Sequence, residues 1–82
     1  MQLCRVTGNA VATVKAPALG DFKLLRVKPE GKGGIEFVAV DTLGAGEGDL
    51  VLVAQGTAAR ALEATAGAPT DATVVAILDP QK

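Results

Sequence analysis

A chain of 82 residues with a net charge of −1 is too short for several domains, and its charge balance gives no electrostatic footprint for nucleic acid or an anionic membrane. A domain of this size buries only about 60% of its unfolded surface, and is usually stabilised further by disulfides, a metal or oligomerisation. One cysteine and no histidine exclude an intramolecular disulfide and argue against zinc, so we expect a single domain, residues 1–82, that oligomerises.

Short apolar runs separated by glycine and proline predict an all-β chain with one short helix. The expected strands are 2–14, with a bulge or bend at Gly8-Asn9, then 22–28, 35–42, 50–54 and 73–79. A loop is expected at 15–21, a hairpin turn at 29–34, a helix over 57–64 that Thr57 caps and Gly67 ends, and a turn at 69–71. Five strands with a helix between the last two are typical of a five-stranded OB-like β-barrel.

The stretch DTLGAGEGDLVLV, residues 41–53, contains three glycines and has two interpretations. A phosphate-binding loop needs a helix after the glycines, whereas Leu50 to Val53 read as a strand. The loop also lacks a Lys-Ser or Lys-Thr pair, and Glu47 and Asp49 would repel a phosphate. The sequence therefore favours a tight turn between two strands.

Two of the expected strands are apolar on both faces. Residues 50–54 and 74–78 do not alternate between apolar and polar side chains, as a strand of a solitary barrel should. The short helix and the loops could cover the outer faces of these strands. A helix of eight residues covers only one or two strands, so we favour other subunits as the cover for the remainder.

The residues needed for chemistry are scarce. The chain has no histidine, and its carboxylates are scattered singly through turns, so we predict no catalytic residue, no cofactor and no metal site. Cys4 is expected to be a buried, inert thiol and Thr57 a helix cap. A small OB-fold binding module for nucleic acid is the alternative function, but two phenylalanines and a net charge of −1 supply neither the aromatic platform nor the basic groove.

The N-terminal residues MQLCRVTGN lack the apolar core of a signal peptide, and no apolar run approaches transmembrane length. With a lone thiol as well, the expected location is the cytoplasm. A pentameric, toxin-like OB module would instead be secreted and disulfide-bonded.

Three segments together resemble a known family. VAVDTLGAGEGDLVLVAQGTAAR (38–60), GNAVATVKAPALGDFKLLRVKP (8–29) and PTDATVVAILD (69–79) are similar to the bacterial microcompartment vertex proteins, which include the ethanolamine-utilisation and carboxysome pentamers. The resemblance spans nearly the whole chain. It implies a structural shell protein without enzymatic activity, in which OB-like barrels form a truncated-pyramid homopentamer. Such pentamers occupy the five-fold corners of a cytoplasmic carboxysome or metabolosome shell, among hexameric shell proteins.

In this setting the glycine loop is expected to lie at a subunit boundary or near the five-fold axis, because glycines allow positive φ and close backbone approach. The candidate residues are Asp41, Gly44, Ala45, Gly46, Gly48, Asp49 and Arg60. Arg60 is expected to pair with one of the two aspartates, within or across subunits; alternatively it is a solvated helix charge. A basic set, Lys23, Arg26, Lys28 and Lys32, is either a solvated edge that discourages stray pairing or a rim that meets the hexamers.

Overall fold

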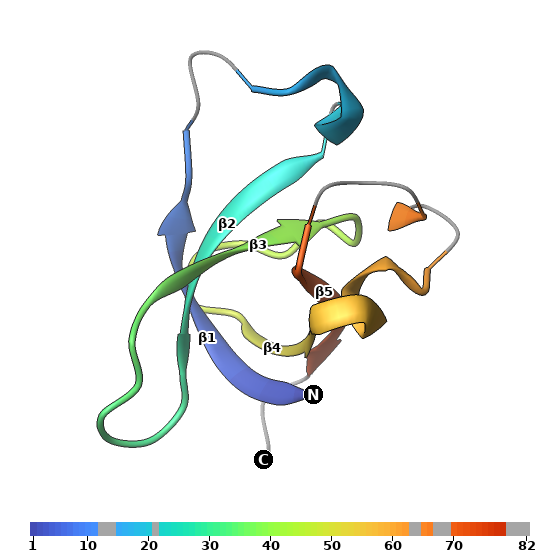
Figure 1. The fold of residues 1–82 in the computed structure, drawn as a ribbon. Coiled ribbons are helices and arrows are strands. Elements are labelled where there is room, and N and C mark those ends of the chain that lie inside the picture. Colours follow the sequence, from blue (N-terminus) through green and yellow to red (C-terminus); the bar gives the residue numbers. More distant parts are fainter. Residues whose placement is uncertain (12–14, 21, 63–64, 67–69, 79–82) are drawn as a thin grey trace.

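The computed structural model describes residues 1–11, 15–20, 22–62, 65–66 and 70–78. In this part the strands are β1 (Gln2–Asn9), β2 (Lys23–Pro29), β3 (Phe37–Asp41), β4 (Leu50–Gln55) and β5 (Ala72–Leu78). Two short 3-10 helices, η1 (Pro17–Leu19) and η2 (Gly56–Arg60), lie between β1 and β2 and between β4 and β5. Figure 1 shows the strands curling around one centre, with η2 on the outside and the β2–β3 hairpin extending away from the barrel. None of the helices described here is long and apolar enough to cross a membrane.

The strands close into a barrel in the order β1-β2-β3-β5-β4, which confirms the predicted five-stranded OB-like barrel. All neighbouring strands are antiparallel except β3 and β5, which run parallel and pair through Val40 with Thr73 and Asp41 with Val74. The bulge in β1 lies between Val6 and Gly8, just before the predicted Gly8-Asn9. A Cβ atom on Gly8 would overlap a guanidinium nitrogen of Arg26, so a side chain at this position would displace the flexible end of Arg26.

The core consists of small and branched side chains from all five strands. Alternate residues of each strand point inward, because successive side chains of a strand face opposite sides of the sheet. The buried cluster comprises Cys4, Val6, Leu25, Val27, Ala39, Ala45, Val51, Val53, Ala72 and Val74, with Phe37 packed against it. Each fully buried valine or leucine contributes about 1.5–3 kcal/mol to stability through removal of apolar surface from water.

The predicted helix over 57–64 is wrong in type and in its start. The chain forms the 3-10 helix η2 at Gly56–Arg60, and residues 63–64 lie outside the described residues. Thr57 is not the cap: the residue at the N-cap position is Gln55, and no side chain caps the helix. Two features explain the difference, namely the turn that Gly56 makes at φ 64° and the tertiary bonds of Ala59. The Ala59 carbonyl accepts hydrogen bonds from the buried hydroxyls of Thr65 at 2.9 Å and Thr73 at 2.7 Å, which hold η2 on the barrel.

The ends of the strands also differ from the prediction by a few residues. The first strand ends at Asn9 instead of residue 14, and residues 12–14 lie outside the described residues. The third strand starts at Phe37 and is shorter than predicted, and Gly31 and Gly33 in the hairpin loop before it adopt positive φ. The expected helix end at Gly67, the start of the turn at 69 and the strand end at 79 are also outside the described residues.

Candidate functional site

The glycine loop after β3 is organised by its two aspartates. The Asp41 side chain is only 3% exposed, and its carboxylate accepts hydrogen bonds from the backbone N–H groups of Leu43 at 3.0 Å, Gly44 at 3.1 Å and Ala45 at 2.8 Å. The Asp49 carboxylate accepts one from the Gly46 N–H at 2.8 Å. Carboxylates that accept backbone N–H bonds form stronger bonds than neutral acceptors, so the loop has a defined conformation within the subunit.

The middle of this loop enters the barrel. Ala45 is fully buried and belongs to the core cluster, and the Lys23 ammonium group donates a hydrogen bond to the Ala45 carbonyl. Gly44 and Gly48 have φ values of 90° and 89°, a region that favours glycine. Gly46 does not adopt positive φ, so the prediction of positive φ holds for two of the three glycines. The loop is a tight turn that also closes one end of the core.

Arg5, which the sequence analysis missed, fixes the outer side of the loop. Its guanidinium group donates to the Gly48 carbonyl at 3.1 Å and forms an ion pair with Glu30 at 3.3 Å. The backbone of the loop joins β1 through two further bonds, from Gly48 N–H to the Val6 carbonyl and from Val6 N–H to the Asp49 carbonyl, both 2.9 Å. The partners of Arg5 are 25 and 43 residues away in sequence, and no local pattern indicates them.

Arg60 is not brought to the aspartates within the subunit. Among the residues that the structure describes, the ion pair of Arg5 with Glu30 is the only one. Asp41 is buried and bonded to its own loop, whereas Asp49 is half-buried. A pairing of Arg60 across subunits stays a prediction, and of the two aspartates Asp49 is the accessible one.

The described residues offer little for catalysis or metal binding. No cluster of His, Cys, Asp and Glu suited to a metal ion occurs among them. Cys4 is buried and free, as expected of a structural cysteine. Burial raises the pKa of the Cys4 thiol, and the negative charge of Glu30 raises the pKa further. The thiolate, which is the reactive form, is therefore disfavoured.

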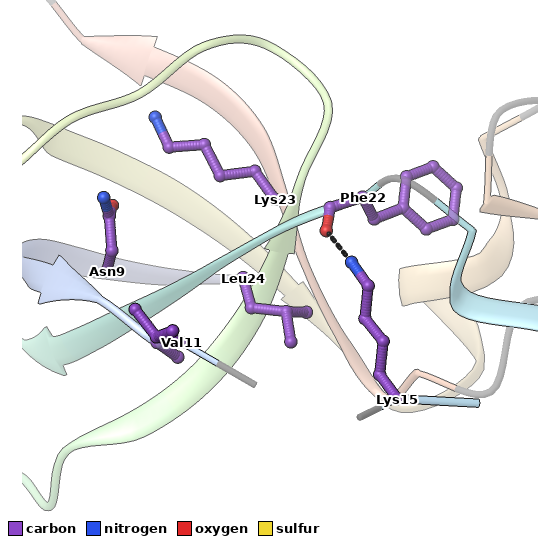
Figure 2. Close-up of a pocket in the computed structure, with 7 residues that line it drawn as sticks. Asn9, Val11, Lys15, Phe22, Lys23 and Leu24 are labelled. Carbon is purple, nitrogen blue, oxygen red and sulfur yellow. Dashed lines mark hydrogen bonds between the residues drawn. The ribbon is translucent and has the colours of Figure 1, made fainter. Parts of the chain in front are cut away.

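A pocket of about 270 Å³ lies at the end of β1 and β2 (Figure 2), where Lys15 and Lys23 are among the lining residues. The Lys15 ammonium group donates to the Phe22 carbonyl at 3.0 Å, and Lys23 donates to the Ala45 carbonyl. In Figure 2 the two side chains extend in different directions. The two positive charges do not converge on one point, so this pocket is not arranged as an anion site.

The outer side of the barrel has one apolar face. Register pairs Leu3 with Leu52 and Leu50 with Leu78, so these side chains share the outer side of β1, β4 and β5. We call these four residues the leucine face; Leu3 is 39% exposed and Leu78 is 37% exposed. The helix η2 covers a different region, where Thr73 of β5 is fully buried and bonded to Ala59. The helix η2 therefore covers one region and leaves the leucine face open. Cover of that face by other subunits stays a prediction.

Comparison with known proteins identifies the family. The family model described as "Ethanolamine utilisation protein EutN/carboxysome" matches residues 1–79. The chain belongs to this EutN/CcmL family. The predicted resemblance to microcompartment vertex proteins is thereby confirmed.

Relatives and a solved structure agree with this assignment. The chain is 42% identical to the carboxysome shell vertex protein CcmL of Thermosynechococcus vestitus, over 96% of the chain and 84% of the relative. It is 40% identical to the bacterial microcompartment shell vertex protein PduN of Salmonella typhimurium, over 96% of each chain. The GrpN pentameric microcompartment shell protein from Rhodospirillum rubrum superposes with a TM-score of 0.84, at 37% identity over 100% of this chain and 98% of that structure.

These likenesses give the function at the level of the family. The EutN/CcmL proteins are structural shell vertex proteins of carboxysomes and metabolosomes, and membership places this chain among them. The prediction that the chain is a structural protein and not an enzyme is confirmed by this membership.

Proposed function

We propose that five copies of this chain form a cyclic homopentamer that occupies a five-fold corner of a microcompartment shell and contacts hexameric shell proteins around it. The observation that carries the proposal is the leucine face, an apolar outer surface that η2 leaves open on a barrel of this family. Monomers rarely expose contiguous apolar surface of this kind without a partner. A flat sheet of hexamers needs five-fold units in order to curve and close, and the chain requires no active site for that role.

Native mass spectrometry of the purified chain tests this proposal directly. We expect a dominant species with five times the 8.2 kDa mass of the chain, over a range of micromolar concentrations. Mixing the pentamer with hexameric shell proteins should then give closed particles, whereas the hexamers alone should give flat sheets or tubes. A stable monomer at micromolar concentration would contradict the proposal and would favour a small OB-fold binding module.

The glycine loop is proposed to lie at a subunit boundary or near the five-fold axis of the pentamer. The bonds of Asp41 and Asp49 to its backbone support this position, because they give the loop one conformation before assembly. A preorganised loop loses little conformational entropy when a neighbouring subunit packs against it. Leu43 at its tip is exposed and provides an apolar contact for a neighbour.

Arg60 is proposed to pair with Asp49 of the neighbouring subunit. Arg60→Ala is expected to lower the melting temperature of the pentamer by a few degrees, because an exposed pair contributes up to about 1 kcal/mol. Arg60→Lys keeps the positive charge, so it should lower the melting temperature less than Arg60→Ala does. Scanning calorimetry at one fixed protein concentration measures both. If Arg60→Ala changes neither the melting temperature nor the mass of the assembly, Arg60 is a solvated charge.

The basic residues on and after β2 are proposed as the rim toward the hexamers. Lys23 is engaged with the Ala45 carbonyl, so Arg26, Lys28 and Lys32 remain as exposed charges for this contact. Charges at the rim of an interface mainly select the partner and set the rate of association. Their effect should therefore appear as a salt dependence of association with hexamers and not of the pentamer itself.

A further inference from the structure

Arg5 of β1 contacts two segments that are far apart in the sequence. Its Nε and Nη2 groups each donate to one carboxylate oxygen of Glu30 at 3.3 Å, and its Nη1 group donates to the Gly48 carbonyl at 3.1 Å. Glu30 follows the last residue of β2 and begins the hairpin that extends away from the barrel (Figure 1), whereas Gly48 belongs to the glycine loop. One guanidinium group therefore holds both segments at once.

The two segments lie on opposite edges of β1. On one edge the Glu30 N–H donates to the Leu3 carbonyl at 3.0 Å, and on the other the Gly48 N–H donates to the Val6 carbonyl at 2.9 Å. Val6 is buried and its neighbour Arg5 is exposed, so the Arg5 side chain lies on the outer face of β1. Among the described residues, no hydrogen bond joins Glu30 directly to the glycine loop.

The geometry of this contact makes the two bonds of Arg5 interdependent. An arginine side chain loses much rotamer entropy when it is fixed in one position. A planar guanidinium group that a carboxylate already holds through two N–H groups presents its remaining N–H groups in a fixed direction. Glu30 thus orients the donor that reaches Gly48. When the base of the hairpin opens and Glu30 moves away, the bond to the glycine loop weakens as well.

We propose that Arg5 couples the base of the β2–β3 hairpin to the glycine loop, so that the two segments open and close together. Arg5 is a positioning residue, since it acts through the segments that it joins. Local openings of this kind are equilibria of the native state, and a coupling between two such equilibria is reciprocal. A partner that holds the hairpin therefore also stabilises the glycine loop, and a partner of the loop stabilises the hairpin.

The coupling belongs to the single chain, and only its consequence for the shell rests on the proposed function. In the proposed pentamer the glycine loop lies at a subunit boundary, and the hairpin carries Lys32, one of the rim charges proposed to face the hexamers. Contact with a hexamer should then strengthen the contacts between neighbouring subunits, because it keeps the loop closed.

The other base of the hairpin offers a matched control. Glu36, directly before β3, is exposed and accepts a hydrogen bond from the Thr7 hydroxyl. Thr7 also lies 3.2 Å from the Arg26 carbonyl, and neither contact involves Arg5 or the glycine loop. Removal of Glu36 therefore takes the same charge from the same hairpin as removal of Glu30, and it leaves the guanidinium contact intact.

Hydrogen exchange of two backbone amides measures the coupling, under conditions in which the exchange rate reports the opening equilibrium. The Glu30 N–H reports on the base of the hairpin, and the Gly48 N–H reports on the glycine loop. The Gly56 N–H, bonded to the Asp71 carbonyl at 2.8 Å, lies outside both segments and serves as the internal reference.

Three single variants test the proposal. Arg5→Ala should raise the exchange rate at both reporting amides by roughly fivefold. Glu30→Ala should raise the rate of the Gly48 amide to a similar extent, although Glu30 makes no bond to the loop. Glu36→Ala should leave the rate of the Gly48 amide unchanged. All three substituted positions are exposed, so the variants should keep their fold, and Arg5→Met replaces Arg5→Ala where the latter does not.

The double variant gives the decisive result. In an Arg5→Ala background, Glu30→Ala should not raise the rate of the Gly48 amide further, because the guanidinium group that joins the two segments is already absent. An unchanged Gly48 rate in Glu30→Ala would overturn the proposal, and so would an equal rise with and without Arg5. Native mass spectrometry of each variant reports the assembly separately. A monomeric wild-type chain rejects the pentamer and not the coupling, so the two failures are distinguishable.

Discussion

Asp41→Ala is expected to destabilise the folded chain by about 3 kcal/mol, because three backbone N–H groups lose a charged acceptor at once. The loss is greatest at Ala45, whose N–H group is buried and has no access to water. The N–H groups of Leu43 and Gly44 lie in exposed residues and can bond to water instead. Ala45 is also part of the core, so a loop that loosens exposes the end of the barrel.

Asp41→Asn is the matched control for this prediction. Its amide oxygen can still accept from Gly44 and Ala45, while its NH₂ group would face the Leu43 N–H, so we expect a loss of about 1 kcal/mol. Urea denaturation at one protein concentration measures both variants, because the stability of an oligomer depends on concentration. Equal losses for alanine and asparagine would show that the three bonds to Asp41 do not hold the loop.

Leu25→Ala is expected to cost about 3–4 kcal/mol, because it removes one of the largest fully buried side chains from a core built mainly of valine and alanine. A domain of this length has a total stability of only about 4–12 kcal/mol. The variant should therefore populate the unfolded state measurably at 37 °C, even in the assembled protein.

The neighbouring residue gives the comparison. Leu24 lies next to Leu25 on β2 but points outward, is only half-buried and lines the pocket of Figure 2. Leu24→Ala should cost about 1 kcal/mol, since its side chain is partly in water in the folded state. Thermal and urea unfolding of both variants check the difference. A Leu24 variant as unstable as the Leu25 variant would mean that the outer face of β2 is buried in the assembly.

The barrel could be predicted from the sequence because its signals are local. The glycine and proline turns separate the strands, and the alternation in LLRVK of β2 gives the buried set Leu25 and Val27 directly. The apolar outer side of β4 was also predictable, because Leu50 and Leu52 break the alternation that water on one side would impose.

The rest depends on contacts between distant residues. The helix was predicted from the alanines at 58 and 59, but the position of that segment is decided by the hydroxyls of Thr65 and Thr73 on the Ala59 carbonyl. No local sequence pattern predicts the bond from Arg5 to Gly48 or the short parallel pairing of β3 with β5. The groove beside that pairing, which Ile35, Phe37 and Val38 help to line, was not predicted either, because Ile35 reads in the sequence as the start of a strand.

The short ladder between β3 and β5 links folding to assembly. It joins Val40 to Thr73, which are far apart along the chain, through two residue pairs, whereas β4 pairs with β5 along its whole length. We therefore expect closure of the ring of strands to be a late step in folding, because it carries the entropy of a long loop, and we expect this short ladder to open more readily than the longer ones. The groove that Ile35, Phe37 and Val38 help to line borders this seam, so a neighbouring subunit that packed there would bind only the closed barrel. Assembly would then shift the opening equilibrium of each subunit toward the closed barrel, and the assembled protein should open less often than the isolated chain.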